Sequence, residues 1–387
     1  MNGKIYRSIG LMSGTSMDGI DAAIIETDGS KVTGFGETHF VEYPGWLKLK
    51  LRRLITDVQN KIIDDVYIKD VERDITKLHI EAVEQLLGNA HLKAEDIDVI
   101  GFHGQTIDHR PHEKFTWQIG DGIYLAERTG INVINNFRAK DVENGGQGAP
   151  LLPIYHKAIV PQSKYPSAVV NIGGVSNITY IDDKNLVAFD TGPGNALIDD
   201  IVLENTGKHF DEGGKVAKAG KVIDDLLKDL LDDEYFAKKP PKSLDRNQFW
   251  DKLAKLLQEK YRAFFFVNKV TTLVEFTVLS IERSLEHLPQ PPKSWYICGG
   301  GVHNKFLMNR LKKVLKGNVQ PISAIDEKLD VNFIEAQGFA FLAVRSMLDM
   351  PISFTSTTGV KNPAKAMTGG DMHRGRTADV IELKAKN

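Results

Sequence analysis

Five short apolar runs in the sequence each stop at a cluster of glycine and polar residues, and this recurring pattern limits the possible folds. The runs occupy 5–12, 97–102, 168–172, 187–189 and 295–298. Short β-rich runs closed by turn-forming residues predict strands. Ligands of α/β sheets gather at loops near strand ends, so each polar cluster is a candidate part of a site.

The segments between these runs favour helices. Apolar residues recur at helical spacing over 70–88, and further helices are expected over 195–207, 249–288, 304–317 and 333–348. Strands mixed with helices throughout predict an α/β protein. A chain of 387 residues exceeds one ordinary core and suits two large α/β domains.

A weak internal repeat agrees with two related domains. Residues 9–25 read as strand, Gly/Ser turn, Asp and strand, and residues 169–181 read as strand, Gly-Gly turn, Ser-Asn and strand. Two domains facing one cleft would produce this repeat, and chance similarity explains it equally well.

Composition excludes several classes of function. The chain has 49 Lys+Arg and 51 Asp+Glu residues, and this near-neutral balance argues against a nucleic-acid binder. No window is apolar enough to span a membrane, and no signal peptide is recognisable, so the expected location is the cytoplasm. The single cysteine, Cys298, cannot form an intrachain disulfide and is expected to be a small core residue.

The first polar cluster, 13–21, has the residue types of an anion-binding turn. Successive backbone N–H groups form an anion cradle, and glycine allows a phosphate to approach closely. Asp18 and Asp21 add carboxylates that can hold Mg²⁺ directly or through water. An ordinary hairpin with Asx capping fits the same residues.

Three other clusters offer chemistry. Asp190, at the end of a short apolar run and beside a glycine turn, is a candidate general base, although a plain turn aspartate would look the same. The triplet 299–301 predicts either a tight strand–helix turn or a flat surface for adenine and ribose. His103 ends a predicted strand, but the nearby histidines do not follow a zinc-binding spacing. The sequence contains neither a P-loop nor a strand-linked dinucleotide fingerprint.

In their order, these clusters resemble the anhydro-N-acetylmuramic acid kinase family. The matching motifs are GLMSGTSMDGID at 10–21, HGQT at 103–106, QIGD at 118–121, Phe137-Arg138 with Asp141, GGQGAP at 145–150, NIGG at 171–174, DTGPGN at 190–195, PKS at 241–243 and CGGG at 298–301. They fall in family order from residue 9 to about residue 345, which is nearly the whole chain.

The resemblance implies an α/β, two-domain actin/hexokinase-like (ribonuclease H-like) fold with mixed sheets and an interdomain active-site cleft. The domains expected from it are 1–128 plus 352–387, with the first phosphate hairpin, and 129–351, with the second hairpin, the adenosine motif and the catalytic Asp. It implies that ATP, water and 1,6-anhydro-N-acetylmuramic acid become N-acetylmuramic acid 6-phosphate and ADP in peptidoglycan recycling. Mg²⁺ dependence and a homodimer are also implied.

The resemblance also assigns roles to individual residues. Asp190 would be the catalytic base that deprotonates water. The predicted ATP-binding residues are Gly14, Thr15, Ser16, Met17, Asp18, Gly19, Ile20, Asp21, Gly173, Gly174, Asn177, Gly299, Gly300, Gly301 and Asn304, with Asp18 and Asp21 as possible Mg²⁺ ligands. The predicted substrate-binding residues are His103, Gln105, Arg138, Asp141, Gln147 and Asn195. A buried ion pair between Arg138 and Asp141 would explain those two residues without a ligand.

Two other functions stay open from the sequence. The chain could be a kinase for an ordinary sugar hydroxyl, where the base would deprotonate the substrate rather than water. It could instead be a non-enzymatic, ATP-driven chaperone or filament protein of the same superfamily. The short segment after residue 345 does not favour the latter, because no added peptide-binding domain is expected there.

Overall fold

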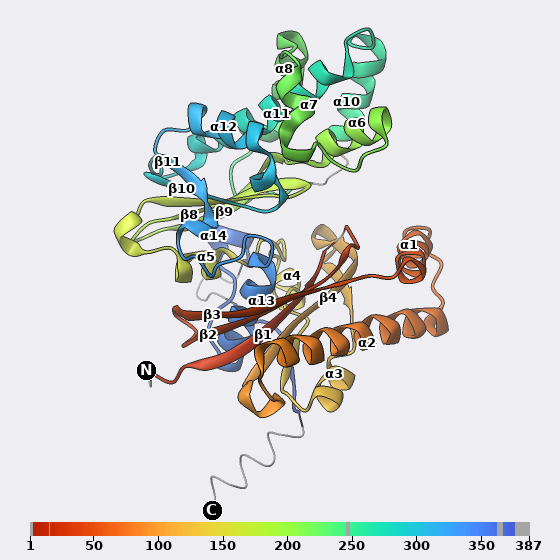
Figure 1. Ribbon diagram of the computed structural model, residues 1–387, viewed down its shortest axis with the longest axis vertical. Helices are drawn as coiled ribbons and strands as arrows, with labels where there is room; N and C mark the ends of the chain where they lie inside the picture. The colour runs from red at the N-terminus through yellow and green to blue at the C-terminus, as the bar shows by residue number, and fades with distance from the viewer. Residues whose placement is uncertain (1–2, 15, 245–247, 362–366, 376–387) are drawn as a thin grey trace, which may run out of the picture. The chain divides into compact units, whose positions relative to one another are not determined.

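The computed structural model describes residues 3–14, 16–244, 248–361 and 367–375, and the structural statements below refer to these residues (Figure 1). The chain forms two compact units. Unit 1 comprises Met1–Ile159 and Phe333–Asn387, and unit 2 comprises Val160–Asn332. Each unit has one mixed sheet with its own covering helices.

The sheet of unit 1 has the order β12-β6-β4-β1-β2-β3, and β5 pairs with β4. Strands β1 (Tyr6–Ser13), β2 (Gly19–Thr27) and β3 (Val32–Glu42) are antiparallel neighbours. Strands β4 (Val99–Arg110) and β6 (Val133–Asn135) continue the sheet in parallel with β1. Two antiparallel additions, β5 (Phe115–Ile119) and β12 (Asp371–His373), complete it.

The sheet of unit 2 has the order β11-β10-β7-β8-β9. Strands β7 (Ser167–Ile172), β8 (Val175–Ile181) and β9 (Leu186–Pro193) are antiparallel neighbours. Strands β10 (Ser294–Cys298) and β11 (Asn318–Pro321) run parallel to β7.

Both units therefore repeat one topology, in which a three-stranded antiparallel meander is followed by two parallel strands beside its first strand. This is the ribonuclease H-like arrangement, so the predicted α/β, actin/hexokinase-like fold with mixed sheets is confirmed. The repeated strand–turn–strand pattern in the sequence corresponds to the β1–β2 and β7–β8 hairpins.

Helices cover both faces of the unit 1 sheet because the strand residues alternate in direction. Ile9 and Leu11 belong to the core cluster that includes α2 (Asp65–Ala90), which Figure 1 shows as a long orange helix along the sheet. Between them, Gly10 faces α13 (Ile334–Met347): a Cβ on Gly10 would lie 1.7 Å from the Ala336 carbonyl oxygen. Only glycine allows this close packing of strand and helix.

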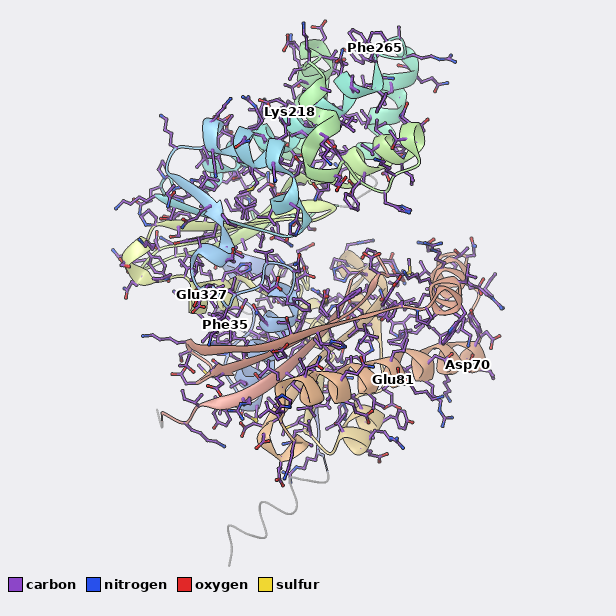
Figure 2. The ribbon with its side chains drawn as sticks, in the orientation of Figure 1. Phe35, Asp70, Glu81, Lys218, Phe265 and Glu327 are labelled. Atoms are coloured by element: carbon purple, nitrogen blue, oxygen red, sulfur yellow. The ribbon has the colours of Figure 1, made fainter. Side chains whose placement is uncertain are left out.

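The remaining helices of unit 1 are α1 (Gly45–Gln59), α3 (Gly122–Thr129), α4 (Ala139–Glu143), α5 (Pro153–Ile159) and α14 (Thr355–Thr358). Charged side chains extend from the outer face of α2, where Asp70 and Glu81 are exposed (Figure 2). The polar outer face and the buried Val71, Ile75 and Val83 make α2 amphipathic.

Unit 2 is built around α11 (Phe266–Arg283), whose middle residues are almost all buried. The other helices are α6 (Ala196–Thr206), α7 (Lys215–Ala219), α8 (Asp224–Leu231), α9 (Glu234–Ala237), α10 (Gln248–Glu259) and α12 (Lys305–Val314). Phe265, just before α11, is 78% exposed and is labelled in Figure 2.

The domain limits differ from those expected, 1–128 plus 352–387 and 129–351. Residues 129–159 belong to unit 1 because β6 pairs with β4 there, and 333–351 belong to it because α13 packs on β1, β2 and β4.

Three element predictions also need correction. The strand predicted over 97–102 continues as β4 to Arg110, so His103 and Gln105 lie within a strand. Asp190 likewise lies inside β9 rather than after it. The helical region 249–288 is divided into α10, α11 and a short 3₁₀ turn at Ser284–His287. No helix in the described part of the chain is long and apolar enough to cross a membrane.

Candidate functional site

The turn between β1 and β2 is anchored to β4. The Ser13 hydroxyl donates to the Gly104 carbonyl oxygen at 3.0 Å, and Gln105 Nε2 donates to the Gly14 carbonyl oxygen at 3.1 Å. The same Gly14 oxygen accepts the Met17 N–H at 3.1 Å, which closes the turn. Gln105, predicted to contact the substrate, therefore supports the turn. Thr15 lies outside the described residues.

The glycines of this turn serve different purposes. A Cβ on Gly19 would lie 2.2 Å from the Val41 carbonyl oxygen, so packing against β3 explains that glycine. A Cβ on Gly14 would meet nothing closer than the Ser16 hydroxyl at 3.6 Å. Because packing does not require glycine at Gly14, its surface is open to close approach by a ligand.

Asp18 in the turn and Asp21 in β2 are the acidic residues expected to hold a magnesium ion together with phosphate. Asp18 lies in the turn, where its carbonyl oxygen accepts the Tyr43 N–H at 2.9 Å, and Asp21 lies in β2 opposite Met12 and Phe40. Among the described residues, no group of three or more His, Cys, Asp or Glu side chains could hold a metal. Mg²⁺ commonly uses one or two carboxylates and completes its shell with phosphates and water, so this donor set fits. Ile20, between them, is fully buried in the core.

A second cluster in unit 1 joins β4 to the residues after β6. Arg138 Nε donates to His103 Nε2 at 3.1 Å, and its NH1 group donates to the Gly148 carbonyl oxygen at 2.6 Å. His103 Nδ1 lies 2.7 Å from the Gly104 carbonyl oxygen, so it is the donor and Nε2 is the acceptor. The hydrogen bonds therefore select the neutral Nδ1–H tautomer of His103.

Electrostatics agree with this tautomer. Burial lowers the pKa of His103 well below its usual range, and the Arg138 charge lowers it further. Burial also lowers the pKa of Arg138, while the negative charges of Glu335 and Asp141 oppose that change. His103 therefore stays neutral at physiological pH beside a cationic Arg138.

Asp141, predicted to bind substrate, accepts three internal hydrogen bonds. The Gly148 N–H donates to one oxygen at 2.7 Å, and the Ser353 and Thr358 hydroxyls donate to the other at 2.6 Å each. Asp141 is almost completely buried. Its carboxylate thus joins the loop at 145–148 to a segment more than 200 residues later. The structure shows no direct ion pair between Arg138 and Asp141 among the described contacts.

Two further residues lie near this cluster. The Gln147 N–H donates to the Thr358 carbonyl oxygen at 2.7 Å, and its own carbonyl oxygen lies 3.0 Å from His109 Nε2. Glu335, in the first turn of α13, faces the charge of Arg138, and burial raises the pKa of Glu335. Glu335 is not among the residues predicted from the sequence. The signal that could have identified it is an acidic residue inside the apolar stretch 333–348.

The β7–β8 hairpin of unit 2 is anchored by the two residues that precede α6. The N–H groups of Gly194 and Asn195 donate to the carbonyl oxygens of Gly174 and Gly173 at 2.9 and 2.7 Å. Asn195 Nδ2 donates to the Ile172 carbonyl oxygen at 3.0 Å. Asn195, predicted to line the sugar site, therefore supports the hairpin.

Gly173 and Gly174 resemble Gly14 in their surroundings. A Cβ on either residue would meet no atom closer than 3.6 Å, and neither has a left-handed backbone conformation. Neither packing nor local backbone strain explains these glycines. Their surface is open for a phosphate, as at the first hairpin.

The glycine triplet after β10 has one open position. A Cβ on Gly299 would lie 2.2 Å from Asn171 Oδ1, and one on Gly301 would lie 2.6 Å from Ile172 Cβ, so packing explains both. Gly300 has only Asn195 Nδ2 nearby, at 3.6 Å. Asn304 caps α12 by accepting the Leu307 N–H at 3.0 Å. The predicted tight turn is present, and Gly300 leaves an open backbone surface within it.

A β-bulge positions Asp190 near the second hairpin. Ser176 pairs with Gly192 and Asn177 pairs with Asp190, so Thr191 is an extra residue in β9. Such a bulge redirects the side chains beside it. Asn177 also pairs with Asn171, which places Asp190 two strands from the start of the Gly173 turn.

Asp190 carries a strongly perturbed carboxyl. One oxygen accepts the Leu244 N–H at 2.8 Å, and the Tyr235 hydroxyl donates to its backbone carbonyl oxygen at 2.6 Å. Burial raises the pKa of Asp190 from 3.8 to about 7, while the Leu244 N–H and the Lys242 charge oppose this rise. A carboxyl with a pKa near neutrality is suited to general-base chemistry.

The predicted site residues thus form two groups, described within their own units. Unit 1 contains Gly14, Asp18, Asp21, Gln105, His103 and Arg138, with Asp141 and Gln147 supporting the loop beside them. Unit 2 contains Gly173, Gly174, Asn177, Asp190, Asn195 and Gly300, with Asn304 as a helix cap. Their assignments as ligand-binding residues stay predictions.

A duplicated ribonuclease H-like topology with an open glycine hairpin in each unit defines a protein of the actin/hexokinase-like class. The sequence pattern of the anhydro-N-acetylmuramic acid kinases matches residues 6–369. The chain belongs to this family.

Relatives of the same family are similar to this chain over almost its full length. The anhydro-N-acetylmuramic acid kinase of Zymomonas mobilis subsp. mobilis is 45% identical, across 95% of this chain and 99% of that protein. The enzyme of the same name from Paramagnetospirillum magneticum is 42% identical, again across 95% and 99%. A solved structure, the activator of the 2-hydroxyisocaproyl-CoA dehydratase from Clostridium difficile with bound ADPNP, has a TM-score of 0.42 at 11% identity, covering 89% of this chain and 96% of that chain.

Proposed function

We propose that this protein phosphorylates 1,6-anhydro-N-acetylmuramic acid with ATP and opens its anhydro ring with water. The products are N-acetylmuramic acid 6-phosphate and ADP, and the reaction serves peptidoglycan recycling. Family membership over residues 6–369 identifies the reaction, and the half-buried Asp190 carboxyl with its raised pKa is the observation that supports the hydrolytic step.

In this reaction Asp190 acts as the general base. Its carboxylate takes a proton from water, and the water oxygen forms a bond to the anomeric carbon. The bond between that carbon and the bridging O6 breaks, and O6 forms a bond to the γ-phosphorus of ATP as ADP leaves. The base has the role of the carboxylate in an inverting glycosidase, and phosphoryl transfer to O6 replaces protonation of the leaving oxygen.

The two hairpins provide the phosphate-binding surface. A Cβ on Gly14, Gly173 or Gly174 would meet no atom closer than 3.6 Å, so phosphate oxygens can approach their backbone. Gly300 provides a similar surface for the adenosine. Asp18 and Asp21 would hold Mg²⁺, which neutralises phosphate charge when bound.

Arg138 supplies a fixed positive charge on the sugar side. Its guanidinium is held by His103 Nε2 and the Gly148 carbonyl oxygen. These contacts orient the group, and Glu335 and Asp141 supply negative charge nearby. The oriented guanidinium can attract an anionic part of the substrate or the transferred phosphoryl group. The protein is further proposed to act as a cytoplasmic homodimer.

Turnover in ¹⁸O-water tests the proposal. The protein is incubated with ATP, Mg²⁺ and 1,6-anhydro-N-acetylmuramic acid, and the products are examined by mass spectrometry. We expect one ¹⁸O atom on the anomeric hydroxyl of a 6-phosphorylated sugar. Absence of a phosphorylated sugar contradicts the proposed function. Phosphorylation of an ordinary sugar hydroxyl without anomeric label supports the other kinase hypothesis instead.

A further inference from the structure

The side chain of Lys242 is enclosed beside Asp190 by the end of α9. Lys242 Nζ donates to the carbonyl oxygens of Tyr235 and Phe236 at 3.1 and 3.3 Å. It lies 4.7 Å from the centre of the Tyr235 ring and 5.7 Å from that of Phe189. These contacts fix the ammonium group through both hydrogen bonds and aromatic faces.

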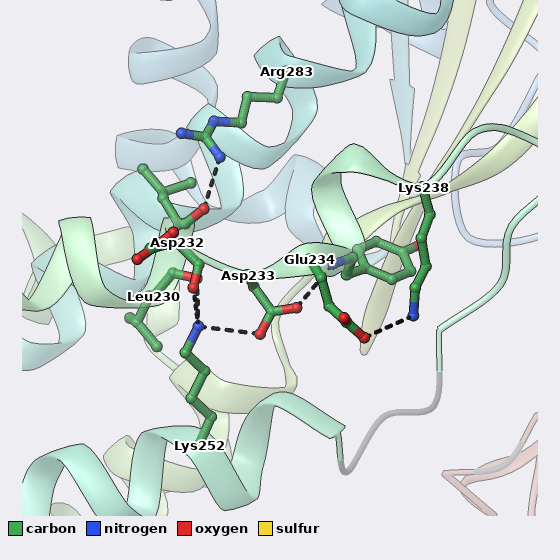
Figure 3. Close-up of polar contacts among 9 residues, drawn as sticks. Leu230, Asp232, Asp233, Glu234, Lys238, Lys252 and Arg283 are labelled. Carbon is green, nitrogen blue, oxygen red and sulfur yellow. Dashed lines mark hydrogen bonds and ion pairs between the residues drawn. The ribbon is translucent and has the colours of Figure 1, made fainter.

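The short helix that receives Lys242 is itself anchored (Figure 3). Asp233 accepts the Tyr235 N–H at 3.0 Å, and Lys252 Nζ donates to the other Asp233 oxygen at 3.1 Å and to the Asp232 carbonyl oxygen at 2.8 Å. Arg283 NH1 donates to the Leu231 carbonyl oxygen at 2.7 Å. The carbonyl oxygens that bind Lys242 are therefore held in place by α10 and α11.

The backbone around Lys242 contacts Asp190 directly. The Asp190 N–H donates to the Lys242 carbonyl oxygen at 3.1 Å, and the Leu244 N–H donates to Asp190 Oδ2 at 2.8 Å. The Tyr235 hydroxyl adds a bond to the Asp190 carbonyl oxygen at 2.6 Å. One segment, 242–244, thus pairs with both the backbone and the carboxylate of Asp190.

A purely apolar role does not account for these contacts. A side chain that only covered Phe189 and Tyr235 would need no donor at its end, whereas the ammonium supplies donors to two helix-end carbonyl oxygens. Carbonyl oxygens at a helix C-terminus favour a nearby cation. The position therefore uses both the apolar stem and the charge of lysine.

We propose that Lys242 is a positioning residue for the base: its ammonium holds segment 242–244 against α9, so that the segment orients Asp190 and favours its ionised form. This inference rests on the proposed function, because it gives Lys242 a role in the water-activating step. Lys242 itself touches neither water nor sugar in this role. It acts through the backbone of its own segment and through its charge.

The charged groups around Lys242 determine the pH range in which its ammonium group can favour the ionised form of Asp190. Burial lowers the pKa of Lys242 to about 8, while Glu286 and Asp190 oppose this and Lys238 adds to it. His287 Nε2, from the turn after α11, lies 3.4 Å from Lys242 Nζ. Lys242 is thus charged at neutral pH, where Asp190 loses its proton, and the two groups titrate as a coupled pair.

Three variants separate positioning from general support of the fold. Lys242→Met keeps most of the apolar stem and removes the charge, and Lys242→Arg restores a cation. Lys238→Met is the matched control: it removes a lysine from the same stretch whose Nζ pairs with Glu234 at 3.4 Å (Figure 3). Each variant is assayed for kcat/KM from about pH 5.5 to 9, with thermal unfolding measured in parallel.

We expect Lys242→Met to move the acidic limb of the kcat/KM profile to higher pH, because the ionised base has lost a favourable charge. Its activity should fall on the order of tenfold at pH 6 and much less above pH 8. Lys242→Arg should return the limb towards that of the wild type, and Lys238→Met should leave it unchanged. A uniform loss at all pH values, with a lower unfolding temperature and no shift of the limb, overturns the positioning role.

A titration without substrate separates this inference from the proposed function. NMR of protein labelled with ¹³C at the aspartate carboxyls follows Asp190, identified by the signal missing in Asp190→Asn. A higher Asp190 pKa in Lys242→Met, but not in Lys238→Met, supports the inference even if no anhydro sugar is phosphorylated. An unchanged Asp190 pKa contradicts it even if the proposed reaction is observed.

Discussion

Replacing Asp190 with asparagine tests whether this carboxyl is destabilised in its charged form. Burial raises its pKa from 3.8 to about 7, so between these values the folded protein keeps a proton that the unfolded chain has released. Stability therefore falls as pH rises through this window, by at most about 1.4 kcal/mol per pH unit. Over roughly three pH units the loss is about 4 kcal/mol, and partial exposure of Asp190 reduces it to roughly 2–4 kcal/mol.

Asp190→Asn has no such proton to lose, and its side-chain oxygen can still accept the Leu244 N–H. We expect the stability of the variant relative to the wild type to increase by roughly 2–4 kcal/mol between about pH 4 and pH 8. Urea unfolding at several pH values, followed by the fluorescence of Trp250 and Trp295 in unit 2, measures this difference. A difference that is the same at both ends of the pH range refutes the reasoning. Turnover should be lost at every pH.

Four further predictions concern unit 1. Gly10→Ala places a Cβ 1.7 Å from the Ala336 carbonyl oxygen, so we expect a loss of at least about 3 kcal/mol in thermal or urea unfolding. Gly14→Ala meets no atom closer than 3.6 Å and should keep the wild-type stability while weakening ATP binding in calorimetry; unchanged ATP affinity contradicts the phosphate role of the first hairpin. Asp141→Ala leaves three buried donors without their acceptor and should cost about 3 kcal/mol or more in urea unfolding, whereas a wild-type midpoint shows that the network is dispensable. Arg138→Lys cannot reproduce the forked contacts of the guanidinium, so kcat should fall on the order of tenfold with little change in unfolding temperature; an unchanged kcat removes the arginine from the sugar site.

The strands could be located from the sequence because their signals are local. The runs before 13, 173 and 299 end within one residue of β1, β7 and β10, since a glycine turn stops an apolar run in the chain itself. The extension of β4 to Arg110 has no such signal. Residues 103–110 are mostly polar, and they form a strand because β1 and β5 supply backbone partners.

The unit boundaries depend on contacts between distant segments. The sequence predicts a helix over 333–348, but it does not say which sheet this helix, α13, covers. The structure shows that α13 covers the sheet of unit 1, where Gly10 and Gly101 allow close contact. A Cβ on these two glycines would lie 1.7 and 2.1 Å from carbonyl oxygens of α13. Glycines inside strands can indicate close backbone approach, yet they do not identify the partner.

In the candidate site, too, residues with a local sequence signal could be predicted, whereas contacts between distant segments could not. Asp190 could be singled out because it follows an apolar run and precedes a glycine turn. Its contacts with Leu244 and Tyr235 come from segments about 50 residues away, with no periodic pattern that links them to β9. The contacts of Asp141 likewise have no local signal, because its partners Ser353 and Thr358 lie more than 200 residues later.

The two hairpins proposed to bind phosphate both expose glycine backbone, but different contacts support them. In unit 1, a side chain of β4 and the turn's own Met17 N–H bind the Gly14 carbonyl oxygen. In unit 2, the N–H groups of Gly194 and Asn195, which precede α6, bind the carbonyl oxygens of Gly174 and Gly173. These two N–H groups are therefore used within the protein. The proposed phosphate binding at the second hairpin would use the backbone of Gly173 and Gly174, whose lack of side chains is required neither by packing nor by backbone conformation.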